Sequence, residues 1–188
     1  MFSKLFALLF LIIFSPILFL TALFIFIEDG SPIFFKQQRV GINKKLFWIY
    51  KFRSMKKSTP NVSKQTLQDR HSFYLNCGSF IRDFSIDELP NLINILKGEM
   101  NFIGPRPALY NEYELIEMRE QVGVNSIKPG LTGWAQVNGR DYLINETKCR
   151  YDKEYLDKKS LYFNLKILLL SFWAVAKPIY MWFKRNFI

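Results

Sequence analysis

The sequence predicts an α+β fold, dominated by helices, that is attached to a membrane element. An uncharged run of 23 residues, 5–27, is long enough to enter a bilayer. Apolar residues three and four positions apart between 89 and 96 predict an amphipathic helix, and aromatic and β-branched pieces between 30 and 55 predict short strands. The chain, with 188 residues, has room for one domain beside the membrane element. We therefore expect three parts: a membrane segment 1–29, a domain 30–160 and a membrane-interface segment 161–188.

The composition favours a membrane partner over nucleic acid. The chain carries 26 Lys and Arg against 16 Asp and Glu, a net charge of +10, and 17% of its residues are aromatic. Such a chain suits a nucleic acid or a membrane surface; because a long apolar segment is present, we expect a lipid bilayer and no nucleic acid. His71 is the only histidine, which excludes zinc sites built on several histidines and nucleophile–histidine pairs. Cys77 and Cys149 lie far apart, which predicts a reducing, cytoplasmic setting and no disulfide framework.

The apolar segment carries a possible hinge, Ser15-Pro16, at its midpoint. The proline removes a backbone hydrogen bond and invites a bend, and the neighbouring hydroxyl can partly satisfy the freed carbonyl. Basic residues flank both ends of the segment, so the positive-inside tendency does not distinguish them. The residues alone therefore leave two topologies equally open: a helix that crosses the bilayer, and a re-entrant helix-break-helix with both ends in the cytoplasm.

Two short extended pieces, 32–35 and 46–53, follow a turn after the membrane segment. Lys51 and Arg53 end the second piece. These two cations are placed to reach a phosphate group, and solvated strand ends explain them equally well.

The stretch 80–107 carries the residues that point most clearly to chemistry. Its apolar stripe, followed by a basic last turn and a glycine stop at Lys97-Gly98, predicts a helix with Asp87 and Glu88 at its start. With Ser85 as N-cap, Glu88 completes a capping box and both acids merely favour the helix end. We prefer a helix start at Asp87, because it moves Pro90 into the first turn, where a proline is tolerated.

Two arginines flank this helix start, and they favour a phosphate site. Arginine forks hold phosphate oxygens, while an acid can bind Mg²⁺ or attack phosphorus. Arg82 or Arg106 alone would more often be a surface ion-pair partner. The rigid turn Gly104-Pro-Arg-Pro107 around one of them makes a shared diphosphate site the better interpretation.

The remaining chain predicts three further helical segments and one loop. Pro107 opens a helix to about Val122 with a solvated acidic face, a charged helix covers 141–158, and residues 161–188 predict amphipathic helices in the headgroup region, broken near Pro178. The loop 128–140 carries an exposed Trp134, Gln136 and Arg140. Such a loop can pack against a nucleotide, and an ordinary structural loop has the same composition.

Four motifs in this order closely resemble those of the bacterial sugar transferases, or monotopic phosphoglycosyl transferases. The resemblance covers nearly the whole chain from the hinge onward. The motifs are Lys51-Phe-Arg-Ser-Met55; Arg82 with Asp87-Glu-Leu-Pro-Asn-Leu-Ile-Asn-Ile-Leu-Lys-Gly-Glu-Met100; Gly104-Pro-Arg-Pro107; and Pro129-Gly-Leu-Thr-Gly-Trp-Ala-Gln-Val-Asn-Gly-Arg140.

The resemblance implies a minimal monotopic enzyme on the cytoplasmic face of the bacterial inner membrane. Such an enzyme moves a phospho-sugar from a UDP-sugar to undecaprenyl phosphate and releases UMP, the first membrane step of glycoprotein, capsule or O-antigen synthesis, ahead of downstream glycosyltransferases. The resemblance also implies a helix-dominated αβα domain and a re-entrant hinge at Ser15-Pro16. Asp87 would be the nucleophile, Glu88 its partner and Mg²⁺ their metal, with phosphate or nucleotide contacts from Arg82 and Arg106.

Two alternatives to this function are kept. A basic, membrane-anchored adaptor without catalysis would use Asp87 and Glu88 only as helix-capping residues. Direct transfer without a covalent intermediate would leave no phospho-sugar on the protein. The residues identify neither the sugar nor the glycoconjugate pathway.

Overall fold

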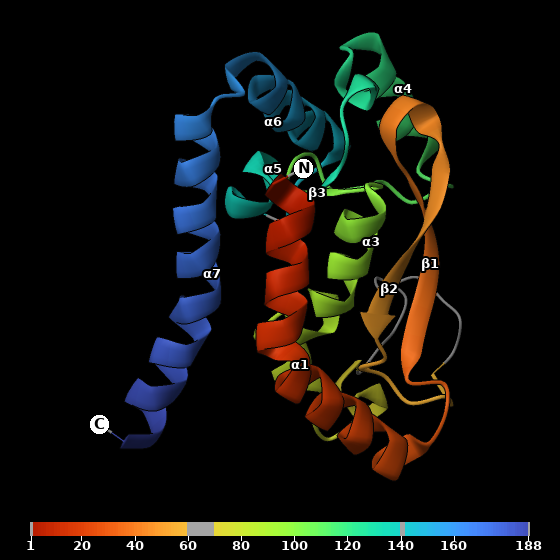
Figure 1. Ribbon diagram of the computed structural model, residues 1–188, viewed down its shortest axis with the longest axis vertical. Helices are drawn as coiled ribbons and strands as arrows, with labels where there is room; N and C mark the ends of the chain where they lie inside the picture. The colour runs from red at the N-terminus through yellow and green to blue at the C-terminus, as the bar shows by residue number, and fades with distance from the viewer. Residues whose placement is uncertain (1, 60–69, 140–141, 188) are drawn as a thin grey trace.

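The computed structural model describes residues 2–59, 70–139 and 142–187, and helices dominate it (Figure 1). Antiparallel β1 and β2 form one small sheet, and parallel β3 and β4 form another. The elements are α1 (Phe2–Asp29), β1 (Phe34–Val40), η1 (Ile42–Lys44), β2 (Leu46–Phe52), η2 (Arg70–Phe73), α2 (Gly78–Asp83), η3 (Ile86–Asn91), α3 (Leu92–Lys97), β3 (Asn101–Ile103), α4 (Tyr113–Gln121), η4 (Val124–Ser126), β4 (Gly130–Thr132), α5 (Trp134–Val137), α6 (Asn145–Lys158) and α7 (Leu161–Phe187). The prediction of a helix-dominated α+β chain is confirmed.

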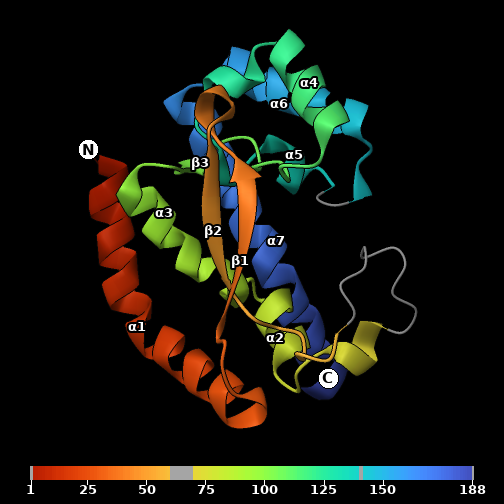
Figure 2. The same ribbon diagram turned by 90° about the vertical axis from the view of Figure 1, so that its right-hand side faces the viewer.

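The elements around the predicted site form successive layers, with α1 on one side of α3 and the β1–β2 hairpin on the other (Figure 1). A core of Ala7, Ile49, Leu92, Ile95 and Met100 joins them. Helices α4 and α6 lie at one end of the molecule, while α2 and the last turns of α1 lie at the other end in both views (Figure 2). The strands and α3 therefore hold the middle of the molecule between two helical ends.

Helix α1 bends near its middle, as both views show (Figures 1 and 2). Pro16 lies inside the helix and has no N–H to donate to the carbonyl of Ile12, four residues earlier. The hydroxyl of Ser15 donates to that same carbonyl at 2.7 Å. The predicted hinge chemistry is confirmed, because the serine replaces the hydrogen bond that the proline removes. The predicted break is wrong, since α1 runs as one helix from Phe2 to Asp29 and only bends here.

One side of α1 packs on the domain, and the rest of its surface is apolar and exposed. Ala7, Thr21 and Ile25 are buried, and so both halves of the helix touch the domain. Among the helices of the described chain, α1 is long and apolar enough to cross a membrane by length and composition. Such an exposed apolar surface is typical of a helix that lies in a membrane; its exposed members are Leu5, Phe6, Leu8, Leu9, Phe10, Ile12, Ile13, Ile17, Phe19, Leu20, Leu23, Phe24, Phe26 and Ile27.

Two asparagines attach the central helix to the hairpin. The backbone N–H of Tyr50 donates to Asn91 Oδ1 at 3.2 Å, and Asn94 Nδ2 donates to the carbonyl of Trp48 at 2.7 Å. Both asparagine side chains are buried, and they take the place that a third strand would have beside β2. They fix η3 and α3 against β2, so that Lys51 on β2 faces the start of η3.

The helix predicted from Pro107 begins later, as α4 at Tyr113, so that its predicted start was wrong. The intervening backbone pairs with β1, because the N–H of Val40 donates to the carbonyl of Ala108 at 2.9 Å and Leu109 forms a bridge with Arg39. Strand-like pairing of these residues replaces the first turns of the expected helix.

The C-terminal segments confirm one expectation and correct another. Helix α6 covers most of the predicted charged helix, whose expected start at Asp141 lies outside the described residues. The break expected near Pro178 is wrong, since α7 runs as a single helix from Leu161 to Phe187. A proline removes one backbone hydrogen bond, and here the helical backbone continues on both sides of it.

Candidate active site

The helix that carries the two acids begins as the 3-10 segment η3, one residue before the preferred start at Asp87. Ser85 precedes it with φ 55° and makes no side-chain cap hydrogen bond, so the capping-box interpretation is wrong. A left-handed serine costs on the order of 1–3 kcal/mol, and strain of this kind is typical of functional sites. Pro90 is buried within η3. The two acids are therefore presented by a tight turn rather than by a capped α-helix.

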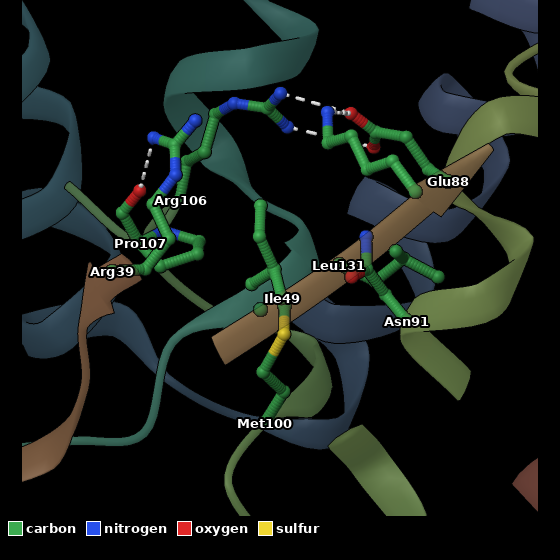
Figure 3. Close-up of a pocket in the computed structure, with 10 residues that line it drawn as sticks. Arg39, Ile49, Glu88, Asn91, Met100, Arg106, Pro107 and Leu131 are labelled. Carbon is green, nitrogen blue, oxygen red and sulfur yellow. Dashed lines mark hydrogen bonds and ion pairs between the residues drawn. The ribbon is translucent and has the colours of Figure 1, made fainter. Parts of the chain in front are cut away.

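Glu88 is held by two cations. Its Oε1 lies 2.6 Å from Lys51 Nζ and 2.9 Å from Arg106 Nη2. Figure 3 shows the side chains of Glu88 and Arg106 pointing toward each other, one from η3 and the other from the turn after β3. Burial raises the pKa of Glu88, but Arg106 and Lys51 together outweigh it and hold that pKa far below its ordinary value. Glu88 is therefore ionised throughout the working pH range.

Lys51 is also substantially buried, with 17% of its side chain exposed. Burial lowers the pKa of Lys51, and the nearby charge of Glu88 opposes that shift. The lysine therefore depends on Glu88 to keep its charge in this environment.

Asp87 differs sharply from its neighbour. Within the described residues its carboxylate makes no hydrogen bond or ion pair. Burial raises the pKa of Asp87 to about 6, against the opposing positive charge of Lys51, and the negative charge of Glu88 adds to the rise. At pH 7 about nine-tenths of Asp87 is then ionised. The two acids of this dyad therefore differ. Glu88 is ionised and its charge is balanced by two cations, whereas Asp87 is partly desolvated and available to react.

Arg82, the second flanking arginine, also belongs to this cluster. Its guanidinium lies 5.3 Å from the centre of the Tyr74 ring, and its charge lowers the pKa of Asp87. The structure therefore brings together five of the predicted site residues: Asp87, Glu88, Lys51, Arg82 and Arg106.

Arg53 lies elsewhere, although the sequence placed it with the site residues. Its side chain is buried and ion-pairs with Asp29 at the end of α1. It also donates to the carbonyls of Pro32 at 2.7 Å and Gly30 at 2.7 Å. These contacts attach the membrane helix to the end of β2, and we leave Arg53 out of the substrate site.

Arg53→Met should therefore reduce stability without changing substrate affinity. Loss of the buried guanidinium leaves Asp29 and two carbonyls without their donor, which costs about 2–4 kcal/mol. Thermal unfolding and the KM for the UDP-sugar that the sequence motifs lead us to expect as substrate test this, with Arg106→Met as the matched cation variant. A rise in KM as large as that of Arg106→Met would return Arg53 to the substrate site.

The loop 128–140 is more structural than its composition suggested. Trp134 is not a free surface ring: its Nε1 donates to Glu154 at 2.8 Å, and the ring packs against Phe163 and lies under Lys166. Both amide atoms of Gln136 are buried without a partner within the described chain. Arg140, predicted to contact substrate, lies outside the described residues.

The described residues provide few ligands for a metal ion. No group of three or more His, Cys, Asp or Glu side chains gathers among them. Glu88 Oε1 is already engaged by Lys51 and Arg106, whereas the Asp87 carboxylate has no such partner. Mg²⁺ commonly takes one or two carboxylates and completes its shell with substrate phosphates and water. Asp87 fits that donor set better than Glu88.

Sequence reasoning missed Arg39 and Asn91, which line one pocket together with Lys51, Glu88 and Arg106 (Figure 3). Arg39 Nη1 donates to the carbonyl of Pro107 at 3.0 Å and so supports the Arg106 turn. In the sequence Arg39 was only one of several basic residues beyond the membrane segment. Asn91 gave a weak signal, because asparagine is a poor residue for a helix interior unless its side chain has a partner.

Two carboxylates that face a cluster of cations, on a helix-dominated protein with an apolar helix, form a site that suits a phosphate-bearing substrate at a membrane. The family model described as "Bacterial sugar transferase" matches residues 1–178. The chain therefore belongs to the bacterial sugar transferase family.

Three relatives illustrate the family. The chain is 41% identical over 157 residues to the uncharacterized sugar transferase EpsL of Bacillus subtilis, covering 84% of this chain and 76% of EpsL. It is 36% identical over 174 residues to the UDP-glucose:undecaprenyl-phosphate glucose-1-phosphate transferase of Escherichia coli, covering 88% and 37% of the two chains. It is 34% identical over 162 residues to the UDP-N-acetylgalactosamine-undecaprenyl-phosphate N-acetylgalactosaminephosphotransferase of Aeromonas hydrophila, covering 84% and 38%. The match thus spans most of EpsL and little more than a third of the other two.

Proposed function

We propose that this protein is a phosphoglycosyl transferase that moves a phospho-sugar from a UDP-sugar to undecaprenyl phosphate. The unequal dyad carries the proposal: Glu88 is neutralised by two cations, while Asp87 is unpaired among the described residues with a pKa of about 6. A residue that only caps a helix needs no such environment. The names of the relatives supply the substrate class, a nucleotide sugar and undecaprenyl phosphate.

In the first step, a carboxylate oxygen of Asp87 attacks the phosphorus next to the sugar in the UDP-sugar. The bond from that phosphorus to the bridging oxygen breaks, and UMP leaves with the electron pair. Attack by one anion on another is opposed by charge repulsion, which nearby fixed cations reduce. Lys51, Arg82 and Arg106 are placed to supply that positive charge.

In the second step, a phosphate oxygen of undecaprenyl phosphate attacks the same phosphorus and releases the Asp87 carboxylate. The product is a polyprenyl diphosphate sugar. Splitting the transfer into two displacements lets one small site serve a soluble donor and a lipid acceptor in turn. Glu88 holds Lys51 and Arg106 in place and thereby tunes the charge around Asp87.

Mg²⁺ is part of the proposal, with Asp87 as its protein ligand and the donor diphosphate as the source of further oxygens. The ion would neutralise charge on the diphosphate as UMP leaves. Glu88, expected from the sequence to share the metal, is better suited to fixing the cations.

The membrane arrangement we propose is monotopic, at the cytoplasmic face of the bacterial inner membrane. The Ser15-Pro16 bend and the packing of both halves of α1 on the domain support a re-entrant helix. The exposed Leu161, Leu165, Leu169 and Trp173 of α7 suit the headgroup region. A site at this surface meets a lipid-linked acceptor without any part of the chain crossing the bilayer.

The topology gives a direct prediction for thiol labelling. Single cysteines at Ser3 and Ser31, in a background without Cys77 and Cys149, should both react with a membrane-impermeant reagent in inverted vesicles and not in spheroplasts. Pro16→Ala restores the missing hydrogen bond, straightens the helix and should expose the residue-3 thiol in spheroplasts. If the two thiols, at residues 3 and 31, were labelled from opposite sides of the membrane in protein that keeps Pro16, this result would contradict the re-entrant arrangement.

The pH dependence follows from Asp87. The nucleophile must be ionised, so kcat/KM extrapolated to low Mg²⁺, where the metal does not lower the pKa of Asp87, should fall about tenfold per pH unit below an apparent pKa near 6. UMP release measured from pH 5 to pH 8 tests this. A rate that stays constant down to pH 5 in folded protein would rule out Asp87 as an ionising group in the rate-limiting step.

The function itself is tested by incubating the purified protein with Mg²⁺, undecaprenyl phosphate and a panel of UDP-sugars, one at a time. Release of UMP with at least one sugar supports the transferase and identifies the donor. No release from any sugar would favour the membrane-anchored adaptor. The donor found would also narrow the glycoprotein, capsule or O-antigen pathway and its downstream glycosyltransferases.

A further inference from the structure

The turn that carries Arg106 is held at four consecutive carbonyls by four different donors. The carbonyl of Pro105 accepts from Gly130 N at 2.9 Å and that of Ala108 from Val40 N at 2.9 Å. The carbonyl of Pro107 accepts from the Arg39 side chain at 3.0 Å. The carbonyl of Arg106 itself accepts from Arg119 Nη1, also at 2.9 Å.

Arg119 reaches this turn from α4 and is itself fixed by Asp152 on α6. Its Nε donates to Asp152 Oδ2 at 2.9 Å, and its Nη2 contacts the same oxygen. Arg119 is 5% exposed and Asp152 is 0% exposed. The pair thus links two helices outside the site to the backbone of Arg106, the residue that contacts Glu88 of the dyad.

A buried ion pair of this kind is not explained by stability alone. Removing two charges from water costs several kcal/mol per ion, and well-packed apolar residues often replace such pairs at no loss. What an apolar pair cannot supply is a third donor aimed at the Arg106 carbonyl. Arginine suits this task, because its planar fork holds a carboxylate and a carbonyl at once.

We propose that Arg119, oriented by Asp152, is a positioning residue that sets the location of Arg106 relative to Glu88 and Asp87. The proposal rests on the proposed transfer reaction for its kinetic readout. Arg106 meets Glu88 across 2.9 Å, so a small displacement of the turn alters the charge around the nucleophile. Displacements of about 1 Å in such a site cost on the order of 100-fold in rate.

The main test replaces the pair by apolar residues, Arg119→Met with Asp152→Leu, in the full-length protein. We expect a melting temperature within a few degrees of the unaltered protein and a kcat/KM for the UDP-sugar lowered about 10- to 100-fold. Replacing the exposed α6 pair by Lys153→Gln with Asp157→Asn serves as the matched control and should change neither value. A kcat/KM within twofold of the unaltered protein would overturn the proposal.

A double-mutant cycle shows whether Arg119 acts through Arg106. In an Arg106→Met background, the apolar pair should lower the rate no further, because the side chain that it positions is absent. Rate losses that multiply would mean that Arg119 acts independently of Arg106, which contradicts the proposal. Arg119→Lys keeps a charge opposite Asp152 and should show an intermediate loss, which covers the case in which the apolar pair does not fold.

Amide hydrogen exchange tests the proposal without reference to activity. The Gly130 amide donates to Pro105 in the same turn, so the apolar pair should speed exchange of the peptide that contains it while α4 and α6 keep their protection. Unchanged protection at Gly130 would contradict positioning of the turn. Absence of UMP release from the unaltered protein would instead count against the transferase function alone.

Discussion

Asp87→Asn should abolish UMP release and at the same time make the protein more stable. Asparagine matches aspartate in shape but is a far poorer nucleophile, so we expect a loss of at least about 1,000-fold in kcat. Burial raises the pKa of Asp87 to about 6, from an ordinary value of 3.8. The ionised form is therefore less favourable in the folded protein, by up to about 3 kcal/mol.

The sign of the stability effect depends on pH in a defined way. Because the folded-state pKa of Asp87 is raised, the contribution of this acid to the free energy of unfolding is most favourable below pH 4. That contribution is lost as the pH rises through about 6. Asp87→Asn should accordingly raise the melting temperature at pH 7 to 8 and leave it unchanged near pH 4. A lower melting temperature at pH 7, with UMP release intact, would indicate a structural role for the acid.

Glu88→Gln should have the second-largest effect on activity. It should lower the stability of the protein, whereas Asp87→Asn should raise it. The substitution leaves Lys51 and Arg106 without the carboxylate that both contact. Because the lysine is mostly buried, we expect a loss of about 2–4 kcal/mol in the free energy of unfolding and a fall in kcat of about 100-fold or more. Thermal unfolding and UMP release measured on the same sample test both parts.

Glu117→Gln is the matched control for this variant, because it removes an exposed carboxylate from α4. Its free energy of unfolding should stay within about 0.5 kcal/mol of that of the unaltered protein, and its kcat should stay within about twofold. The loss in Glu88→Gln should also shrink progressively as the pH falls below the ordinary pKa of a glutamate, because the unfolded chain then takes up a proton that folded Glu88, whose pKa is held far below that value, does not. Equal melting temperatures for the two variants would show that the Lys51–Glu88–Arg106 cluster contributes little to the fold.

The local patterns in the sequence predicted the elements well. The apolar stripe of α3, the bend at Ser15-Pro16 and the second strand follow from spacing and residue type, which act over a few neighbours. The break expected at Pro178 was wrong, because a single proline is compatible with a continuous helix. The start of α4 was also wrong, since pairing with β1 is a long-range contact that spacing does not reveal.

Contacts between residues far apart in the sequence also limited what could be predicted about the site. Asp87, Glu88, Arg82 and Arg106 lie within one short stretch, and the motifs that contain them identified the cluster before any geometry was known. Lys51 and Arg53 looked equivalent in the sequence, two positions apart on one strand. The structure separates them, because Lys51 meets Glu88 whereas Arg53 meets Asp29.

The supporting contacts could not have been predicted from the sequence. Arg119 and Asp152 are 33 positions apart and lie on different helices. In the sequence both look like ordinary members of charged helices. Their burial is the feature that distinguishes them, and burial depends on how the helices pack.

The most direct measurement of the central claim is the intact mass of the protein after incubation with the UDP-sugar and Mg²⁺, without undecaprenyl phosphate, and acid quenching. We predict a mass increase of one phospho-sugar, located on the peptide that contains Asp87, absent from Asp87→Asn and removed when the lipid acceptor is added. Protein that turns over with both substrates but never carries this mass, at any quench time, would contradict covalent transfer through Asp87 and favour direct transfer between the two substrates.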